Sequence, residues 1–264
     1  MIDLKTKKWP LWFSIGAVVI FSFFISRDAL ARLAWQKYHS PRVTSVFSGN
    51  NAKIEFELGN YYFNVSGLGA YDLKKAEKHF KRALKINPNI ADAWHQLARI
   101  DFLRGDFSNA LVKINKQIEI HGDLFMASYY IRGLINGYAG NLKEAEADFK
   151  KFLNWDQTNW AAHNDLAWVY FKSGEYKKVE TIAREGLSFN KNNPWLLISL
   201  GASLLNQEKK NEAKKIFESA KLAAAALTEI DWHRAYPGNN PHVASRGLEA
   251  MKKTIEYNLE LSKK

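Results

Sequence analysis

The feature that most constrains this chain is a repeat with a period of 34 residues. From about residue 52 to residue 227, small and apolar residues recur with that spacing. Residues 160–193 and 194–227 form the clearest pair of units, in which Ala167 and Gly201 occupy the same place. A small residue at a fixed place lets two helices approach closely, and a period of this length is typical of paired helices. The pattern therefore predicts a stack of helical hairpins.

Five units in near register carry the pattern. Its residues are Leu58, Gly59, Tyr62, Ala76, Phe80, Ala83 and Pro88 in the first unit, Trp94, Leu97, Ala98, Gly105, Phe107 and Ala110 in the second, Tyr129, Gly133, Gly140, Ala145 and Phe149 in the third, Leu166, Ala167, Tyr170, Gly174, Val179, Ala183 and Gly186 in the fourth, and Leu200, Gly201, Leu204, Ala213, Phe217 and Ala220 in the fifth. These units resemble tetratricopeptide repeats, whose pattern has an aromatic residue, Leu-Gly, Tyr, a turn glycine and later Ala, Phe, Ala and Pro. Asp101 and Asn136 depart from it, since each stands where the family has tyrosine.

The resemblance implies an all-α fold, a right-handed superhelix of about five helix-turn-helix units over residues 52–227. One hairpin cannot bury its apolar face alone, so the hairpins must stack and the ends of the array need caps. Residues 228–264 are expected to form a loop, followed by a C-terminal capping helix after Asn240 and Pro241, a good cap and first-turn pair. The apolar stripe of that helix is Ala244, Leu248, Met251, Ile255 and Leu259.

An uncharged, apolar run precedes the repeats. Residues 9–26 carry no charge, and a helix of that length spans roughly 27 Å, close to the hydrocarbon thickness of a bilayer. The run predicts one N-terminal transmembrane helix that contacts the membrane through residues 9–25, after a basic cytoplasmic stub at residues 1–8. A continuation of the helix to about residue 38 would place Trp35 near the far interface. Residues 39–51 are expected to be a linker.

The charges around this run predict its orientation. Three lysines among residues 1–8 favour a cytoplasmic N-terminus by the positive-inside rule, so the repeats are expected in the periplasm of a bacterium, tethered to the inner membrane by a single pass. A cleaved signal peptide with a cleavage site at residues 29–31 is the alternative. We favour a retained anchor because the apolar run exceeds the usual signal-peptide length and Arg27 lies in the cleavage region.

Composition and motifs argue against several kinds of chemistry. The chain contains no cysteine, which excludes disulfides, thiolate metal sites and cysteine nucleophiles. The net charge is +11, but the excess within the repeats is mild and dispersed, so no nucleic-acid partner is predicted. No glycine-rich phosphate loop or HExxH motif occurs, and seven histidines lack ligand spacing: His39, His79, His95, His121, His163, His233 and His242. We expect no catalytic residue, cofactor or metal site.

The resemblance also implies where partners bind. In the repeat family, the first helix of each unit lines a concave groove through its second, fifth, ninth, twelfth and thirteenth positions. Carried over by register, these positions give Asn60, Phe63, Asn64, His95, Arg99, Phe102, Tyr130, Tyr138, Asn164, Trp168, Lys172, Trp195 and Asn206. Such a mixture of aromatic, amide and basic groups suits an extended peptide or a partner helix, while any one of the aromatic residues has packing between hairpins as its alternative role. Phe56 stands where the carboxylate clamp of chaperone-binding members has its first lysine, which disfavours a cytosolic chaperone adaptor.

Together these inferences predict a membrane-tethered scaffold or adaptor, not an enzyme. It would bind partner proteins within an extracytoplasmic envelope complex of the assembly, secretion, pilus or polysaccharide-export type, as the resemblance implies. The alternative hypothesis is an accessory subunit that stabilises an inner-membrane enzyme or transporter complex, for example in cytochrome maturation or polysaccharide synthesis, mainly through its transmembrane helix. Residues 232–240 form the least generic segment, which either contacts a partner or turns the chain into the cap.

Overall fold

The computed structural model describes residues 27–64, 70–235, 240 and 244–263. The transmembrane helix and the basic stub predicted at the N-terminus fall on residues 1–26, outside the described residues. None of the helices in the described part of the chain combines the length and the apolar character that spanning a bilayer requires.

Ten helices of the described chain form five consecutive hairpins. Their bounds are α3 (Ala52–Tyr62) with α4 (Leu73–Ile86), α5 (Ala93–Leu103) with α6 (Phe107–His121), α7 (Ala127–Ala139) with α8 (Leu142–Trp155), α9 (Trp160–Lys172) with α10 (Tyr176–Phe189), and α11 (Pro194–Asn206) with α12 (Lys210–Ala225). A short 3-10 helix, η1 (Gly122–Phe125), joins the second hairpin to the third. Apart from one isolated bridge between Phe63 and Tyr71, the regular elements described are helices. The predicted all-helical repeat fold is confirmed.

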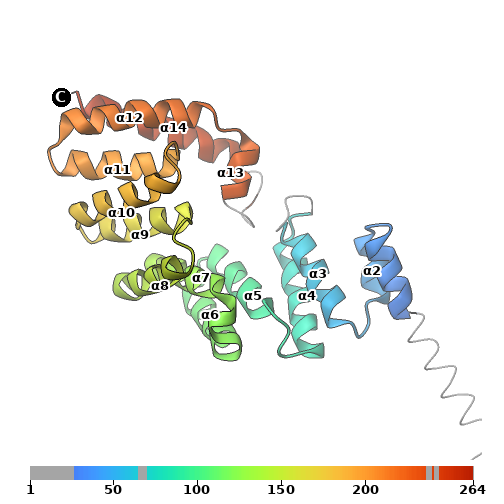
Figure 1. The fold of residues 1–264 in the computed structure, drawn as a ribbon. Coiled ribbons are helices and arrows are strands. Elements are labelled where there is room, and N and C mark those ends of the chain that lie inside the picture. Colours follow the sequence, from blue (N-terminus) through green and yellow to red (C-terminus); the bar gives the residue numbers. More distant parts are fainter. Residues whose placement is uncertain (1–26, 65–69, 236–239, 241–243, 264) are drawn as a thin grey trace, which may run out of the picture.

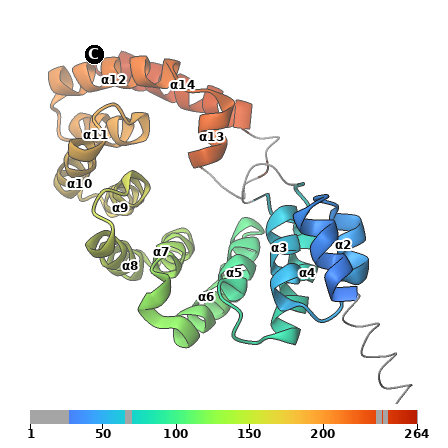
Figure 2. The same ribbon diagram turned by 45° about the vertical axis from the view of Figure 1, so that its right-hand side comes forward.

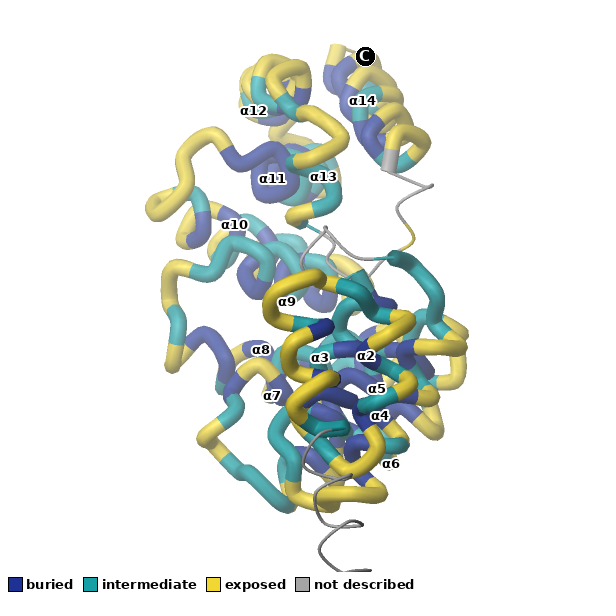
Figure 3. The backbone as a smooth tube through the Cα atoms, turned by 90° about the vertical axis from the view of Figure 1, so that its right-hand side faces the viewer, coloured by how far each residue is buried: buried dark blue, intermediate teal, exposed yellow. Residues whose placement is uncertain are grey.

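The hairpins stack side by side into a superhelical array that curves into an open arc (Figure 1). Figure 2 shows the first helices α5, α7, α9 and α11 along the inner side of the arc, with the second helices α6, α8, α10 and α12 outside. The inner helix α11 is buried over most of its length, whereas α12 alternates buried and exposed residues (Figure 3). The inner surface of the arc is therefore the concave surface that the resemblance to tetratricopeptide repeats implies.

Small residues set the distance between the two helices of a hairpin. A Cβ atom added at Gly59 would lie 2.4 Å from the ring of Phe80, and one added at Gly201 would lie 2.7 Å from the ring of Phe217. Both phenylalanine side chains are fully buried. Each glycine thus provides the space that a ring from the partner helix fills, which explains why small residues and phenylalanine recur together.

The turns within hairpins use left-handed backbone. Gly140 and Gly174 follow α7 and α9 with φ values of 89° and 73°. In the fifth hairpin, Glu208 occupies the equivalent place with a φ of 60°. A side chain in this conformation brings its Cβ too close to the next carbonyl oxygen, at a cost of about 1–2 kcal/mol. Glu208 is therefore a strained residue in an otherwise regular turn.

The segment expected as a linker, residues 39–51, contains a helix. This helix, α2 (Pro41–Phe47), begins with proline at its first turn and follows a helical stretch at residues 27–36. Directly after α2, the Ser48 hydroxyl donates to Glu55 Oε1 at 2.5 Å. The segment therefore packs onto the first hairpin and covers its end, instead of serving as a plain spacer.

Glu55 connects α2 and α3 to α4 through a buried cluster. Its carboxylate has no exposed surface; its oxygens lie 2.7 Å from His79 Nδ1 and 3.0 Å from the Arg82 guanidinium. Burial alone would raise the pKa of Glu55, but hydrogen bonds with His79 and Ser48 and the charge of Arg82 bring it below its usual value. The carboxylate is thus ionised and paired inside the N-terminal end of the array.

The C-terminal region contains α13 (Glu229–Ala235) and α14 (Ala244–Leu261). Four residues of the predicted apolar stripe are buried, with α14 packed on α12: Leu248, Met251, Ile255 and Leu259. The segment expected as a loop from residue 228 is helical as far as Ala235. Thr228 and Asp231 explain the difference, because each side chain accepts a hydrogen bond from the backbone N–H of the other, a capping box.

Candidate partner-binding cavity

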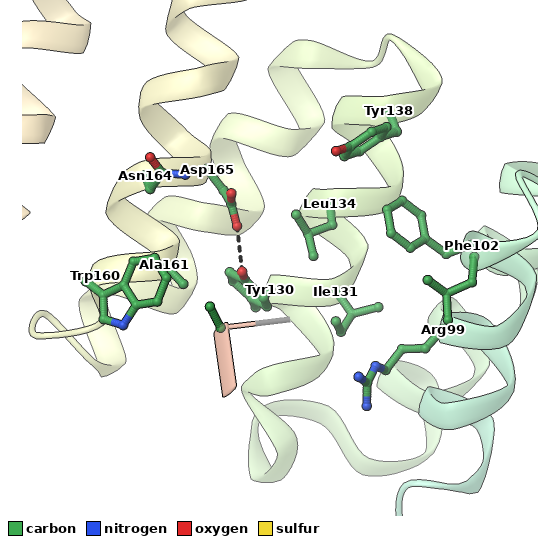
Figure 4. Close-up of a pocket in the computed structure, with 12 residues that line it drawn as sticks. Arg99, Phe102, Tyr130, Ile131, Leu134, Tyr138, Trp160, Ala161, Asn164 and Asp165 are labelled. Atoms are coloured by element: carbon green, nitrogen blue, oxygen red, sulfur yellow. Dashed lines mark hydrogen bonds between the residues drawn. The ribbon is translucent and has the colours of Figure 1, made fainter. Parts of the chain in front are cut away.

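The inner surface contains a cavity of about 220 Å³ between α5, α7, α9 and the end of α13 (Figure 4). Five of the predicted groove residues line it: Arg99, Phe102, Tyr130, Tyr138 and Asn164. Seven other residues complete the lining: Leu103, Ile131, Leu134, Trp160, Ala161, Asp165 and Ala235. Cavities that enclose a whole drug-sized ligand measure about 300–1,000 Å³, so this one has room for one or two side chains.

Asp165 is the acidic residue of the cavity. Its Oδ2 accepts a hydrogen bond of 2.5 Å from the Tyr130 hydroxyl (Figure 4). Asn164 also donates to it, and the Ser199 hydroxyl holds the Asn164 amide by donating to Oδ1 at 3.0 Å. Burial raises the pKa of Asp165 to about 6, although the hydrogen bonds from Tyr130 and Asn164 act in the opposite direction. Near neutral pH the cavity therefore contains a carboxylate that is easily protonated.

Arg99 supplies the positive charge of the cavity. It comes from α5, so Arg99 and Asp165 lie on helices at either side of α7 (Figure 4). Its Nη1 donates to Gln96 Oε1 at 2.9 Å, and its guanidinium carbon lies 4.8 Å from the ring centroid of Phe63. Burial lowers the pKa of Arg99 to about 10, which still leaves the side chain charged at neutral pH. The cavity thus has a cationic end at α5 and an acidic end at α9.

A row of aromatic rings runs along the inner surface beside these charges. The rings of Phe102 and Tyr138 are 5.2 Å apart between centroids in an edge-to-face contact, and Tyr138 stacks on Trp168 at 5.0 Å. The backbone at Gly137 makes this contact possible, because an added Cβ would lie 2.7 Å from the Trp168 ring. Mutual packing holds the rings in place, so a ligand would meet them with little loss of conformational freedom.

A second aromatic group lies at the C-terminal side of the cavity. Trp160 stacks on Trp195 with centroids 4.8 Å apart, and Trp195 contacts Trp232 of α13 at 6.1 Å. These three indoles connect α9, α11 and α13, and α13 also brings Ala235 to the cavity. The segment that contains α13 is therefore part of the inner surface.

The other predicted groove residues lie outside this cavity. They are Asn60, Phe63, Asn64, His95, Trp168, Lys172, Trp195 and Asn206. Phe63, His95 and Trp195 are buried in the packing of the helices. Burial lowers the pKa of His95 to about 3, so its ring is neutral beside the Ser128 hydroxyl at 3.2 Å. Lys172 is exposed near the end of α9.

Comparisons with known proteins agree with this geometry. The family model "Tetratricopeptide repeat" matches residues 127–159. The TPR repeat-containing protein YpiA of Bacillus subtilis (strain 168) is 25% identical over 173 residues, which cover 65% of this chain and 39% of YpiA. The crystal structure of a tetratricopeptide repeat protein from Parabacteroides merdae ATCC 43184 superimposes with a TM-score of 0.60 at 15% identity, covering 92% of this chain and all of that one. Residues 127–159 therefore match a tetratricopeptide repeat, and the chain as a whole has the fold of tetratricopeptide-repeat proteins.

The matched part of this chain spans about two-fifths of the length of YpiA. The fold is also similar to the crystal structure of YrrB, described as a TPR protein with an unusual peptide-binding site, with a TM-score of 0.54, 12% identity and coverage of 78% of this chain and 97% of YrrB. At such identities the structural likeness establishes the fold.

Asp165 and Trp160 are the polar and aromatic lining residues that sequence reasoning missed. They occupy the sixth and first positions of the unit at residues 160–193, whereas the family's groove set uses the second, fifth, ninth, twelfth and thirteenth. One signal in the sequence could have singled out Asp165. Its neighbours three and four residues away are Ala161, Ala162, Trp168 and Val169, so no ion pair within its own helix is available to it.

Proposed function

We propose that this tetratricopeptide-repeat protein is an interaction scaffold that binds a segment of a partner protein along the inner surface of its array. The observation that carries the proposal is the cavity between α5, α7 and α9, where fixed aromatic rings adjoin a guanidinium and a carboxylate. Aromatic and arginine side chains dominate the binding energy of protein interfaces. The peptide-binding site described for YrrB, which shares the fold, supports the same class of ligand. The proposed role is binding and not catalysis.

Photocrosslinking from the cavity tests this function. Tyr138 is 58% exposed and lines the cavity, so replacing it with benzoylphenylalanine places the reactive group where a partner would lie. Tyr257 on α14 is 66% exposed and is absent from the cavity lining, which makes the same replacement there a matched control. We expect a defined set of crosslinked proteins from position 138 that position 257 does not give. Identical crosslinking patterns from the two positions, or none from position 138, would overturn the scaffold function.

We further propose that the scaffold is tethered to a bacterial inner membrane with the array in the periplasm. The support is the sequence alone: the uncharged run at residues 9–26 and the three lysines before it. Exchange of residues 9–26 for an unrelated single-pass anchor separates the scaffold from the accessory-subunit alternative. A scaffold keeps its crosslinked partners after the exchange, whereas a subunit that acts through its own transmembrane helix loses its function.

A further inference from the structure

Four carboxylates of the array differ in their partners: Glu55, Asp101 and Asp148 are buried, and Asp165 is half-buried at the cavity. Glu55 pairs with Arg82, and Asp148, on α8, forms a bidentate pair with the Arg132 guanidinium at 2.9 and 2.7 Å. Asp101 pairs with Lys113. For Asp165, by contrast, no ion pair forms with any of the residues that the structure describes. Its hydrogen bonds come from Tyr130 and Asn164, both of which are neutral.

A carboxylate without a cation is costly to keep away from water, because the interior disfavours the charged form. Two neutral donors offset part of that desolvation penalty. The pKa of Asp165 is nevertheless raised, which shows that part of the penalty is not offset. A cation from a ligand would remove the rest, since it would supply the opposite charge at a place where solvent screens poorly. Asp165 lines the cavity, so a ligand in the cavity can reach it.

The neighbours of Asp165 also suit a cation with an apolar stem. Trp160, Tyr130 and Tyr138 line the same cavity, and the faces of such rings attract ammonium and guanidinium groups. Ile131 and Leu134 provide apolar surface on α7 against which methylene groups can pack. The cavity volume of about 220 Å³ matches one long side chain better than a folded element.

Arg99 influences where a bound cation lies. Its charge lies at the α5 end of the cavity, so a second basic residue directed towards α5 would be repelled. The positive charge at α5 therefore favours placement of a bound cation at the α9 end, beside Asp165.

We propose that this cavity binds a single lysine or arginine side chain from an extended segment of the partner protein, with the cation paired to Asp165 and its stem packed between Trp160 and α7. This inference rests on the proposed scaffold function and narrows it to partners with a basic anchor residue. It assigns Asp165 a role in specificity that the family's groove positions do not include.

The test is selection of random eight-residue peptides displayed on phage against the full chain, the Asp165→Asn variant and the Glu144→Gln variant. Glu144 is an exposed acid on the outer helix α8, so its change removes the same charge away from the cavity. We expect the unchanged protein and the Glu144→Gln variant to enrich peptides with Lys or Arg at one place, and the Asp165→Asn variant to lose that enrichment. For the best peptide, the Asp165→Asn change should raise Kd about ten-fold or more, as expected for a charge-assisted hydrogen bond.

Other outcomes separate the two proposals. Enrichment of peptides without a basic residue, or an unchanged preference in Asp165→Asn, would overturn the basic anchor and leave the scaffold function standing. Failure to enrich any peptide would also overturn the basic anchor, and the crosslinks from position 138 would then decide the scaffold function by themselves. The Asp165→Glu variant tests whether lost packing, and not lost charge, explains a lost preference in Asp165→Asn. Because it keeps the negative charge, it should keep the preference for basic peptides.

Discussion

Asp148 and Asp165 lie on consecutive helices and have opposite surroundings. Asp148, on the outer helix α8, is 4% exposed and is held by Arg132 and by the Asn136 amide at 3.3 Å. Asp165, on the inner helix α9, has neutral donors and faces a cavity. The Asp148 carboxylate links α7 and α8 through its ion pair with Arg132. The Asp165 carboxylate forms no ion pair with the described residues. The difference separates charges that hold the array together from a charge that is available to a ligand.

The largest effect is expected from Asp148→Ala, which tests the packing side of this comparison. The change leaves the partly buried Arg132 without its bidentate partner and removes the acceptor of the Asn136 amide. We expect the free energy of unfolding to fall by about 3 kcal/mol, measured by urea denaturation. The exposed Glu144→Ala serves as the control and should change stability by less than about 0.5 kcal/mol. Equal effects of the two changes would show that the Asp148 pair is not structural.

A change of the opposite sign is expected from Asp165→Asn. Asparagine keeps an oxygen to accept from Tyr130 but carries no charge, so the desolvation penalty of the half-buried carboxylate disappears. Since the pKa of Asp165 is raised from 3.8 to about 6, the gain in unfolding free energy at pH 7 should reach up to about 3 kcal/mol. Urea denaturation at several pH values measures it, and a loss of stability in the variant at pH 7 would mean that the charge is needed for folding.

The pH dependence gives this prediction a second check. A carboxyl group whose pKa is raised on folding destabilises the protein above that pKa and is neutral in both states below the unfolded value. The advantage of the variant should therefore be complete above about pH 6 and vanish as the pH falls to about 4. The other titratable groups around the cavity in the described chain are Arg99, Tyr130, Tyr138 and the nearby His95. The pKa of Arg99 is about 10, that of Tyr138 is raised by burial, and that of His95 is about 3, so these three groups keep their protonation state across this window.

The smallest effect is expected from Glu208→Gly, which asks whether strain away from the cavity also limits stability. Glu208 has a φ of 60° and is exposed, with Lys210 at 3.7 Å as a weak partner. Glycine adopts this conformation without the Cβ clash, so unfolding free energy should rise by about 1 kcal/mol with no change in peptide binding. Thermal denaturation measures the gain, and Glu212→Gly, in the first turn of α12, is a control that should destabilise.

Much of the fold was predictable because the repeat period is set by packing within each hairpin. Gly59 and Gly201 indicate close helix contacts, and the structure places Phe80 and Phe217 against them. Helix α2 was missed although Pro41 marks its first turn, because a short helix packed on a neighbour gives little periodicity in its own sequence. Helix α13 was missed although Thr228 and Asp231 have the spacing of a capping box.

The cavity was predictable only in part. Arg99 and Tyr130 follow from the groove positions of the family, since those positions depend on the face of one helix. Whether an aromatic residue at such a position is open or buried depends on the neighbouring hairpin, and for this reason Phe63 and Trp195 are covered while Tyr138 is exposed. The contribution of Ala235 requires the path of α13 across the inner surface, which no local pattern encodes.

That path has a mechanical consequence. Ala235 follows the fifth hairpin in sequence, yet it lines a cavity whose other walls come from the second, third and fourth hairpins. A stack of repeats bends like a spring, because each hairpin contacts only its neighbours. Because α13 extends from the C-terminal end of the array to its middle, the width of the cavity depends on the curvature of the array. A force that straightens the array would move α13 away from α5, and the affinity for a bound segment would then fall.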